Sequence, residues 1–156
     1  MPRVLICLLA MLPLAACKEE TPGPYLEFAG GSFVANYRNA DVYYGFVVRP
    51  LKTLPEGAAL VAEFEMPGGA APGRVTQPVR AGKLQYMFRS PGLTGVETRK
   101  RYTAVLRLTD AGGKELERLS KSFVAEVGGE SLPSAPLTEG PGYKPAPAAE
   151  ELFKRR

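Results

Sequence analysis

Residues 101–113 read "RYTAVLRLTDAGG", and apolar and polar side chains alternate through most of this stretch. A period of two is typical of a β-strand that buries one face, because successive side chains of a strand point to opposite sides. The residues from Asp110 to Gly113 are typical of a tight turn between antiparallel strands. The stretch therefore predicts a strand and a hairpin turn, with four side chains facing a core: Tyr102, Ala104, Leu106 and Leu108.

The same alternation recurs in five other segments: "SFVANYR" (32–38), "DVYYGFVV" (41–48), "ALVAEFEM" (59–66), "KLQYMFR" (83–89) and "KSFVAEV" (121–127). In the fourth of these, Leu84, Tyr86 and Phe88 share the predicted inward face. "YLEF" (25–28) and "RVTQPVR" (74–80) are weaker strand candidates, and Pro78 places the second at a sheet edge because proline has no N–H. "KELERLSK" (114–121) has helical spacing, but we expect it to begin the last strand.

Six to eight short strands without a long helix predict an all-β domain of about seven strands over residues 25–128. The pattern resembles an antiparallel β-sandwich of the immunoglobulin or fibronectin type III kind. Tyr102, which begins the penultimate strand, is similar to the tyrosine corner of such domains, with a plain buried tyrosine as the alternative. The disulfide and the tryptophan of antibody domains are absent from the sequence. A small β-barrel is the alternative architecture.

The first residues have the pattern of an export signal. Arg3 precedes an apolar run from Val4 to Leu14, which is shorter than the roughly 20 residues that span a bilayer, and small residues follow. "Leu14-Ala15-Ala16-Cys17" resembles the lipobox of bacterial lipoproteins. The resemblance implies a signal peptide over residues 1–16, cleavage between Ala16 and Cys17, and a tether over residues 17–24.

The same resemblance implies that Cys17 is the lipidation site and carries a diacylglycerol on its thiol and an N-acyl chain on its amine. Two or more acyl chains anchor a protein stably to a bilayer. Lys18 stands where enteric lipoproteins kept in the inner membrane have aspartate, so the expected location is the outer membrane, facing the periplasm.

Composition restricts the chemistry that the domain can perform. The chain has no histidine, and its two cysteines, Cys7 and Cys17, both lie near the N-terminus, so we expect neither a metal nor another cofactor in the body of the protein. Ser120 and Lys121 are neighbours and would point to opposite faces of a strand rather than form a dyad. Glu63 and Glu65 share a face, where solubilising carboxylates are the simpler interpretation than acid–base catalysis.

Positive charge is concentrated in one part of the chain. Between Arg74 and Arg107 there are eight basic residues and one acidic residue, a net charge of +7, against +4 for the whole chain. One hypothesis is a basic contact face for anionic lipid, cell-wall polymer or an acidic protein, made of Arg89, Arg99, Lys100, Arg101 and Arg107. The alternative is ordinary solvation and protection of strand edges by charged residues. We expect no nucleic acid partner, because the protein is predicted to be exported.

Two further features bear on binding. Tyr43 and Tyr44 must point to opposite sides of their strand, so one of them leaves the core face. Residues 129–156 are rich in proline, glycine and alanine and predict a disordered, flexible tail, in which "AAEELFKRR" could form one or two helical turns. That end is either a docking peptide or a solvated terminus.

These features together predict a lipid-anchored binding or scaffolding module of the cell envelope without catalytic activity. Its partners would be the membrane and an envelope protein or the cell wall. The alternative is an envelope enzyme or enzyme inhibitor that acts through the loops of the sandwich.

Overall fold

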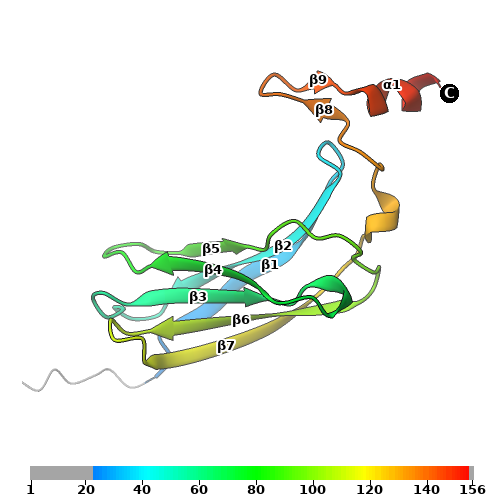
Figure 1. The fold of residues 1–156 in the computed structure, drawn as a ribbon. Coiled ribbons are helices and arrows are strands. Elements are labelled where there is room, and N and C mark those ends of the chain that lie inside the picture. Colours follow the sequence, from blue (N-terminus) through cyan, green and yellow to red (C-terminus); the bar gives the residue numbers. More distant parts are fainter. Residues whose placement is uncertain (1–22, 155–156) are drawn as a thin grey trace, which may run out of the picture.

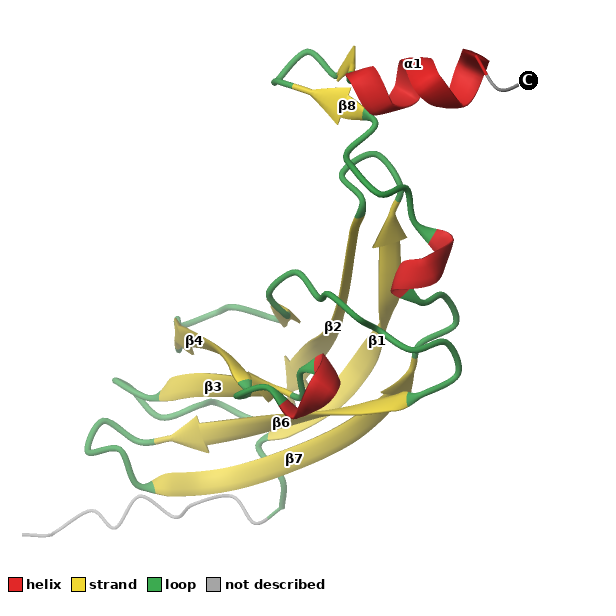
Figure 2. Ribbon diagram, turned by 45° about the vertical axis from the view of Figure 1, so that its right-hand side comes forward, coloured by secondary structure: helices red, strands yellow, loops and turns green. Residues whose placement is uncertain are grey.

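The computed structural model describes residues 23–154. Seven strands form two antiparallel sheets that pack face to face, and a small C-terminal extension projects from one end of them (Figures 1 and 2). The elements are β1 (Leu26–Asn36), β2 (Asp41–Pro50), β3 (Ala59–Phe64), η1 (Pro67–Gly69), β4 (Gly73–Pro78), β5 (Tyr86–Arg89), β6 (Arg101–Thr109), β7 (Glu115–Val124), η2 (Gly129–Ser131), β8 (Thr138–Glu139), β9 (Lys144–Pro145) and α1 (Pro147–Lys154).

The sheets have the strand orders β1-β2-β5 and β4-β3-β6-β7, and we call them sheet A and sheet B. Three strands in one sheet and four in the other confirm the β-sandwich with an arrangement like that of fibronectin type III domains. The barrel alternative is wrong, because the two sheets are separate hydrogen-bonded units. β4 lies at the edge of sheet B, as the proline in its sequence predicts.

The core is built from the alternating residues of both sheets. On β6, Tyr102, Ala104, Leu106 and Leu108 are all at most 1% exposed, as the alternation predicts. On β2, the inward side chains include Tyr44 and Phe46, and aromatic rings from six strands contact one another across the sandwich. "KELERLSK" lies in β7, which confirms its interpretation as the start of the last strand.

Strand β1 joins two segments that the sequence pattern treats separately. A bulge between Phe28 and Gly30 shifts the register, so that Leu26 and Phe28 face the core before it and Phe33 faces the core after it. A Cβ atom at Gly31 would lie 2.6 Å from the carbonyl oxygen of Gly45. The bulge and the missing side chain let a single long strand keep its apolar residues inward.

Tyr102 forms the tyrosine corner. Its hydroxyl accepts a hydrogen bond from the backbone N–H of Glu97, five residues upstream, at 3.1 Å. The loop before β6 is thereby tied to the first residues of that strand, as the resemblance implies.

Strand register defines two ends of the sandwich. At the proximal end, where the described chain begins, lie the segments 23–25, 51–58, 79–85 and 110–114. At the distal end lie the segments 37–40, 65–72 and 90–100 and the start of the C-terminal extension. A strand of ten residues such as β2 is about 33 Å long, so the two ends are well separated.

Two sequence-based predictions require correction. Leu84 is 82% exposed rather than inward, because pairing with β2 begins only at Tyr86 and Leu84 belongs to the preceding loop. The tail, which the composition predicts to be disordered, contains the β8–β9 pair and α1; of these elements the sequence predicts only the helical turns. No helix among residues 23–154 is long and apolar enough to cross a membrane.

Candidate binding surfaces at the two ends of the sandwich

The structure separates the five basic residues of the hypothetical contact face. Arg89 lies on the outer side of sheet A, where its guanidinium pairs with Asp41 at 3.0 Å. Arg101 and Arg107 lie on the outer side of sheet B, which is the opposite surface of the sandwich. Arg99 and Lys100 lie in the distal loop before β6, and Lys100 pairs with Glu97. The five residues therefore do not share one face.

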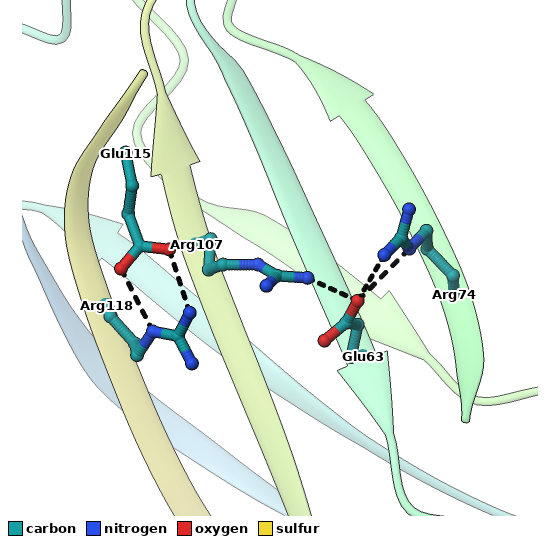
Figure 3. A network of polar contacts seen from close by, with 5 residues as sticks. All are labelled: Glu63, Arg74, Arg107, Glu115 and Arg118. Atoms are coloured by element: carbon teal, nitrogen blue, oxygen red, sulfur yellow. Dashed lines mark hydrogen bonds and ion pairs between the residues drawn. The ribbon is translucent and has the colours of Figure 1, made fainter. Parts of the chain in front are cut away.

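Carboxylates from elsewhere in the sequence neutralise part of this charge on sheet B. Glu63 of β3 lies between Arg74 of β4 and Arg107 of β6 and pairs with both, as Figure 3 shows. Beside them, Glu115 and Arg118 of β7 form a two-bond pair at 2.9 and 3.0 Å. These ion pairs form a row across the four strands of sheet B, which we call the ion-pair ladder. The row fits the alternative in which these charges are ordinary solvated residues and not a basic contact face.

The pKa values of this ladder follow from its geometry. Hydrogen bonds from Arg74 hold the pKa of Glu63 below its ordinary value, with a further contribution from the charge of Arg107. Hydrogen bonds from Arg118 lower the pKa of Glu115 in the same way. Carboxylates held in the ionised form suit ion pairing better than proton transfer near neutral pH. Glu65 has a separate role, since it accepts the backbone N–H of Thr103 at 2.8 Å.

The two adjacent tyrosines of β2 have different environments. Tyr43 points out of sheet A, and the guanidinium of Arg89 lies 3.4 Å from the centre of its ring. Tyr44 is fully buried, and its hydroxyl lies 3.0 Å from the carbonyl oxygens of Glu65 and Thr103, to either of which it can donate. Burial raises the pKa of Tyr44 above its ordinary value. Tyr43 is therefore the outward member of the pair, engaged with an arginine, and Tyr44 connects the two sheets.

The proximal end contains a hollow of about 1330 Å³. Its walls come from the β2–β3 loop and the β4–β5 loop, with Tyr25 and Tyr86 among the lining residues. Three basic residues and one acidic residue line it, a net charge of +2: Lys52, Arg80, Lys83 and Glu56. The hollow is thus a basic depression at the end of the sandwich where the described chain begins.

The first described residues are held firmly at this end. The ammonium group of Lys52 donates to the carbonyl of Gly23 at 2.7 Å and lies 3.8 Å from the centre of the Tyr25 ring. The N–H of Tyr25 donates to Glu117 at 2.9 Å, and its carbonyl accepts the N–H of Leu51 at 2.8 Å. These contacts fix where the chain from the N-terminus joins the domain.

A tyrosine also holds the β4–β5 loop. The hydroxyl of Tyr86 accepts the N–H of Arg80 at 2.9 Å, and the ammonium group of Lys83 lies 4.4 Å from the centre of the Tyr86 ring. Gly82 has a φ of 72°, which glycine adopts without strain and which turns the loop. The consequence is that Leu84, just after this turn, projects from the domain.

The distal end carries the C-terminal extension. The carbonyl of Arg38, in the β1–β2 turn, accepts the N–H of Leu137 at 2.7 Å, and the Arg38 guanidinium lies 5.2 Å from the centre of the Tyr143 ring. A smaller hollow of about 530 Å³ lies between the loop 93–97 and the segment 129–136. Tyr37 and Tyr143 are 48% and 62% exposed at this end. In both ribbon views the extension stands beyond the β1–β2 turn (Figures 1 and 2).

Two predicted site residues, Ala16 and Cys17, lie outside the described residues. The sequence patterns did not single out Lys52, and they assigned Leu84 to the core. In the structure both residues line the hollow at the proximal end, from separate loops. The sequence does show two loops with glycine and lysine, the β2–β3 and β4–β5 loops. It does not show that these loops lie together in the folded domain. The sequence matches no known protein family, and comparison with characterised proteins finds no match.

Proposed function

We propose that this protein is a lipid-anchored module of the bacterial cell envelope that binds or scaffolds a partner and has no catalytic activity. The observation that carries the proposal is the placement of the two termini. The described chain begins at the proximal end, six residues after Cys17, and the C-terminal extension leaves from the distal end. An anchor on Cys17 would hold the proximal end beside the bilayer and direct the distal end away from it.

The dimensions support this arrangement. Six residues span at most roughly 20 Å, whereas the strands of the sandwich are about 33 Å long. The exposed residues Tyr37 and Tyr143, with the nearby guanidinium of Arg38, are of the types that contribute most to protein interfaces. The distal end is therefore the preferred surface for an envelope protein or cell-wall partner.

Labelling with a radioactive fatty acid tests the anchor. The wild-type protein and the control variant Cys7→Ser should incorporate label, because Cys7 lies in the segment that the signal peptidase would remove, whereas Cys17→Ser should incorporate none. Equal labelling of Cys17→Ser and wild type would reject the anchor.

Site-specific photocrosslinking in intact cells tests the binding surface. A photoreactive residue at Tyr37 or Tyr143 should give a discrete crosslinked product, and the same residue at Thr76, on the outer side of sheet B, should not. Crosslinking at Thr76 alone would place the partner on sheet B and contradict the role of the distal end.

A further inference from the structure

The proximal end combines exposed apolar side chains with positive charge. Leu84 is 82% exposed, Met87 67% and Leu51 47%, and Leu84 and Met87 are the two most exposed large apolar residues among the side chains that the structure describes. Leu84 lines the basic hollow from the β4–β5 loop, and Leu51 begins the β2–β3 loop, whose residues 52–56 line it. Isolated exposed leucines are common, but here they accompany Arg80 and Lys83 at one end of the domain.

This combination has the chemistry of a surface that meets a bilayer. Leucine and methionine side chains enter the boundary between headgroups and acyl chains, and lysine and arginine beside them attract anionic headgroups. The basic residues Arg80 and Lys83 lie in the same loop as Leu84, within five residues of one another. One loop therefore presents both kinds of contact together.

The short length of chain between Cys17 and the domain indicates that a bilayer is what the proximal end meets. Only five residues separate Cys17 from Gly23, and Gly23 is held at the proximal end by Lys52. A lipid on Cys17 would therefore keep this end within roughly 20 Å of the bilayer. No other surface of the described domain is held so close to that anchor point.

We propose that the proximal end docks on an anionic phospholipid bilayer through the loop 79–85, with Leu84 in the headgroup boundary and Arg80 and Lys83 on phosphate groups. This proposal rests on the proposed lipid anchor. Docking restricts the rotation of the domain about its tether, so that the distal end points away from the membrane. The sheet faces, where ion pairs such as Glu63–Arg107 neutralise the bases, stay in solvent.

Fluorescence quenching on vesicles tests the docked orientation. After lipidation of Cys17 and removal of Cys7, Ala81→Cys supplies one free thiol in the docking loop, and Tyr37→Cys supplies one at the distal end as the control position. The lipidated protein, labelled with an environment-sensitive fluorophore, is reconstituted into phosphatidylcholine vesicles with or without phosphatidylglycerol. Lipids that carry a nitroxide on the headgroup quench a fluorophore at the bilayer surface.

We expect quenching at position 81, stronger with phosphatidylglycerol and weaker at high salt, and little quenching at position 37. Arg80→Gln with Lys83→Gln should lower the docking equilibrium constant about fivefold for each basic residue removed. The matched control, Arg99→Gln with Lys100→Gln, makes the same charge change at the distal end and should leave docking unchanged. Leu84→Ser should also weaken docking without altering the circular dichroism of the domain.

Equal quenching at positions 81 and 37, or equal effects of the two double variants, would overturn the proposal. Failure of the anchor gives a different result, because a protein without acyl chains does not float with vesicles of phosphatidylcholine alone. Protein that floats with the vesicles but is not quenched at position 81 rejects the docking surface and leaves the anchor intact.

Discussion

The tyrosine corner offers a one-atom test of the fold. Tyr102→Phe removes the hydroxyl that accepts the N–H of Glu97 and leaves the fully buried ring in place, 5.5 Å from the ring of Phe33. Apolar burial is unchanged, so the variant isolates the hydrogen bond. Nothing else in the tyrosine side chain contributes to the difference.

The size of the loss in stability depends on the N–H of Glu97, which no longer has the Tyr102 hydroxyl as its acceptor. A buried donor left without a partner costs about 1–3 kcal/mol, and this bond is only part-buried, so water can satisfy some of the loss. We therefore expect Tyr102→Phe to lower the free energy of unfolding by about 1–1.5 kcal/mol. For a domain of this size that is a decrease in Tm of about 4–12 °C.

Urea unfolding followed by far-ultraviolet circular dichroism measures this difference, since the chain has no tryptophan to report unfolding by fluorescence. The midpoint should fall at unchanged slope, because the surface exposed on unfolding stays the same. Tyr37→Phe is the matched control, as Tyr37 is 48% exposed. If Tyr102→Phe unfolds at the same urea concentration as Tyr37→Phe, the hydroxyl does not stabilise the loop and the reasoning fails.

Three other variants test the packing and the charges. Gly31→Ala would bring a Cβ to 2.6 Å from the Phe123 side chain and should lower the free energy of unfolding in urea by about 1–3 kcal/mol. Gly30→Ala, with open space around it, should lower it much less. Equal losses in the two variants would contradict the close packing at Gly31. Tyr44→Phe should lower Tm by the equivalent of about 1 kcal/mol through loss of the hydrogen bond between the sheets, and an unchanged Tm would refute this contribution. Glu63→Gln should lower stability by less than about 1 kcal/mol near neutral pH. Because the pKa of Glu63 is lowered in the folded state, the stabilisation by its carboxylate is present above the ordinary glutamate pKa and is lost as the pH falls through the folded value. The stabilities of wild type and Glu63→Gln should therefore converge in acid. A difference in stability that persists in acid would contradict the ion-pair account.

The fold class and most of the core could be predicted from alternation alone. The inward positions of β2 and β6 follow from the two-residue period of a strand, a local property that any window of the sequence displays. The hairpin at Asp110 could be predicted for the same reason, since the Asp110 carboxylate binds the N–H groups of Gly112 and Lys114 within the turn itself. Strand number and the edge position of β4 were also within reach of local patterns.

The candidate surfaces could not be predicted in this way, because they depend on residues far apart in the chain. Charge along the sequence suggested one basic face, but strand order places Arg89 and Arg107 on opposite sides and gives each a carboxylate partner from another strand. The alternation around Leu84 continues a strand pattern beyond Tyr86, where the pairing of β5 with β2 ends. The proximal end exists only because separate loops converge there.

The local alternation of apolar and polar residues thus determines which side chains point inward, because the backbone geometry of a strand directs neighbouring side chains to opposite faces. The pattern from Arg3 to Cys17, which predicts an export signal, is equally local, since it is a matter of adjacent residue types. Three features are not determined locally: the bulge in β1, the sheet that each strand joins, and the ion-pair partner of each charged residue. They arise from contacts across the folded domain, and their energies exist only once the two sheets have packed together.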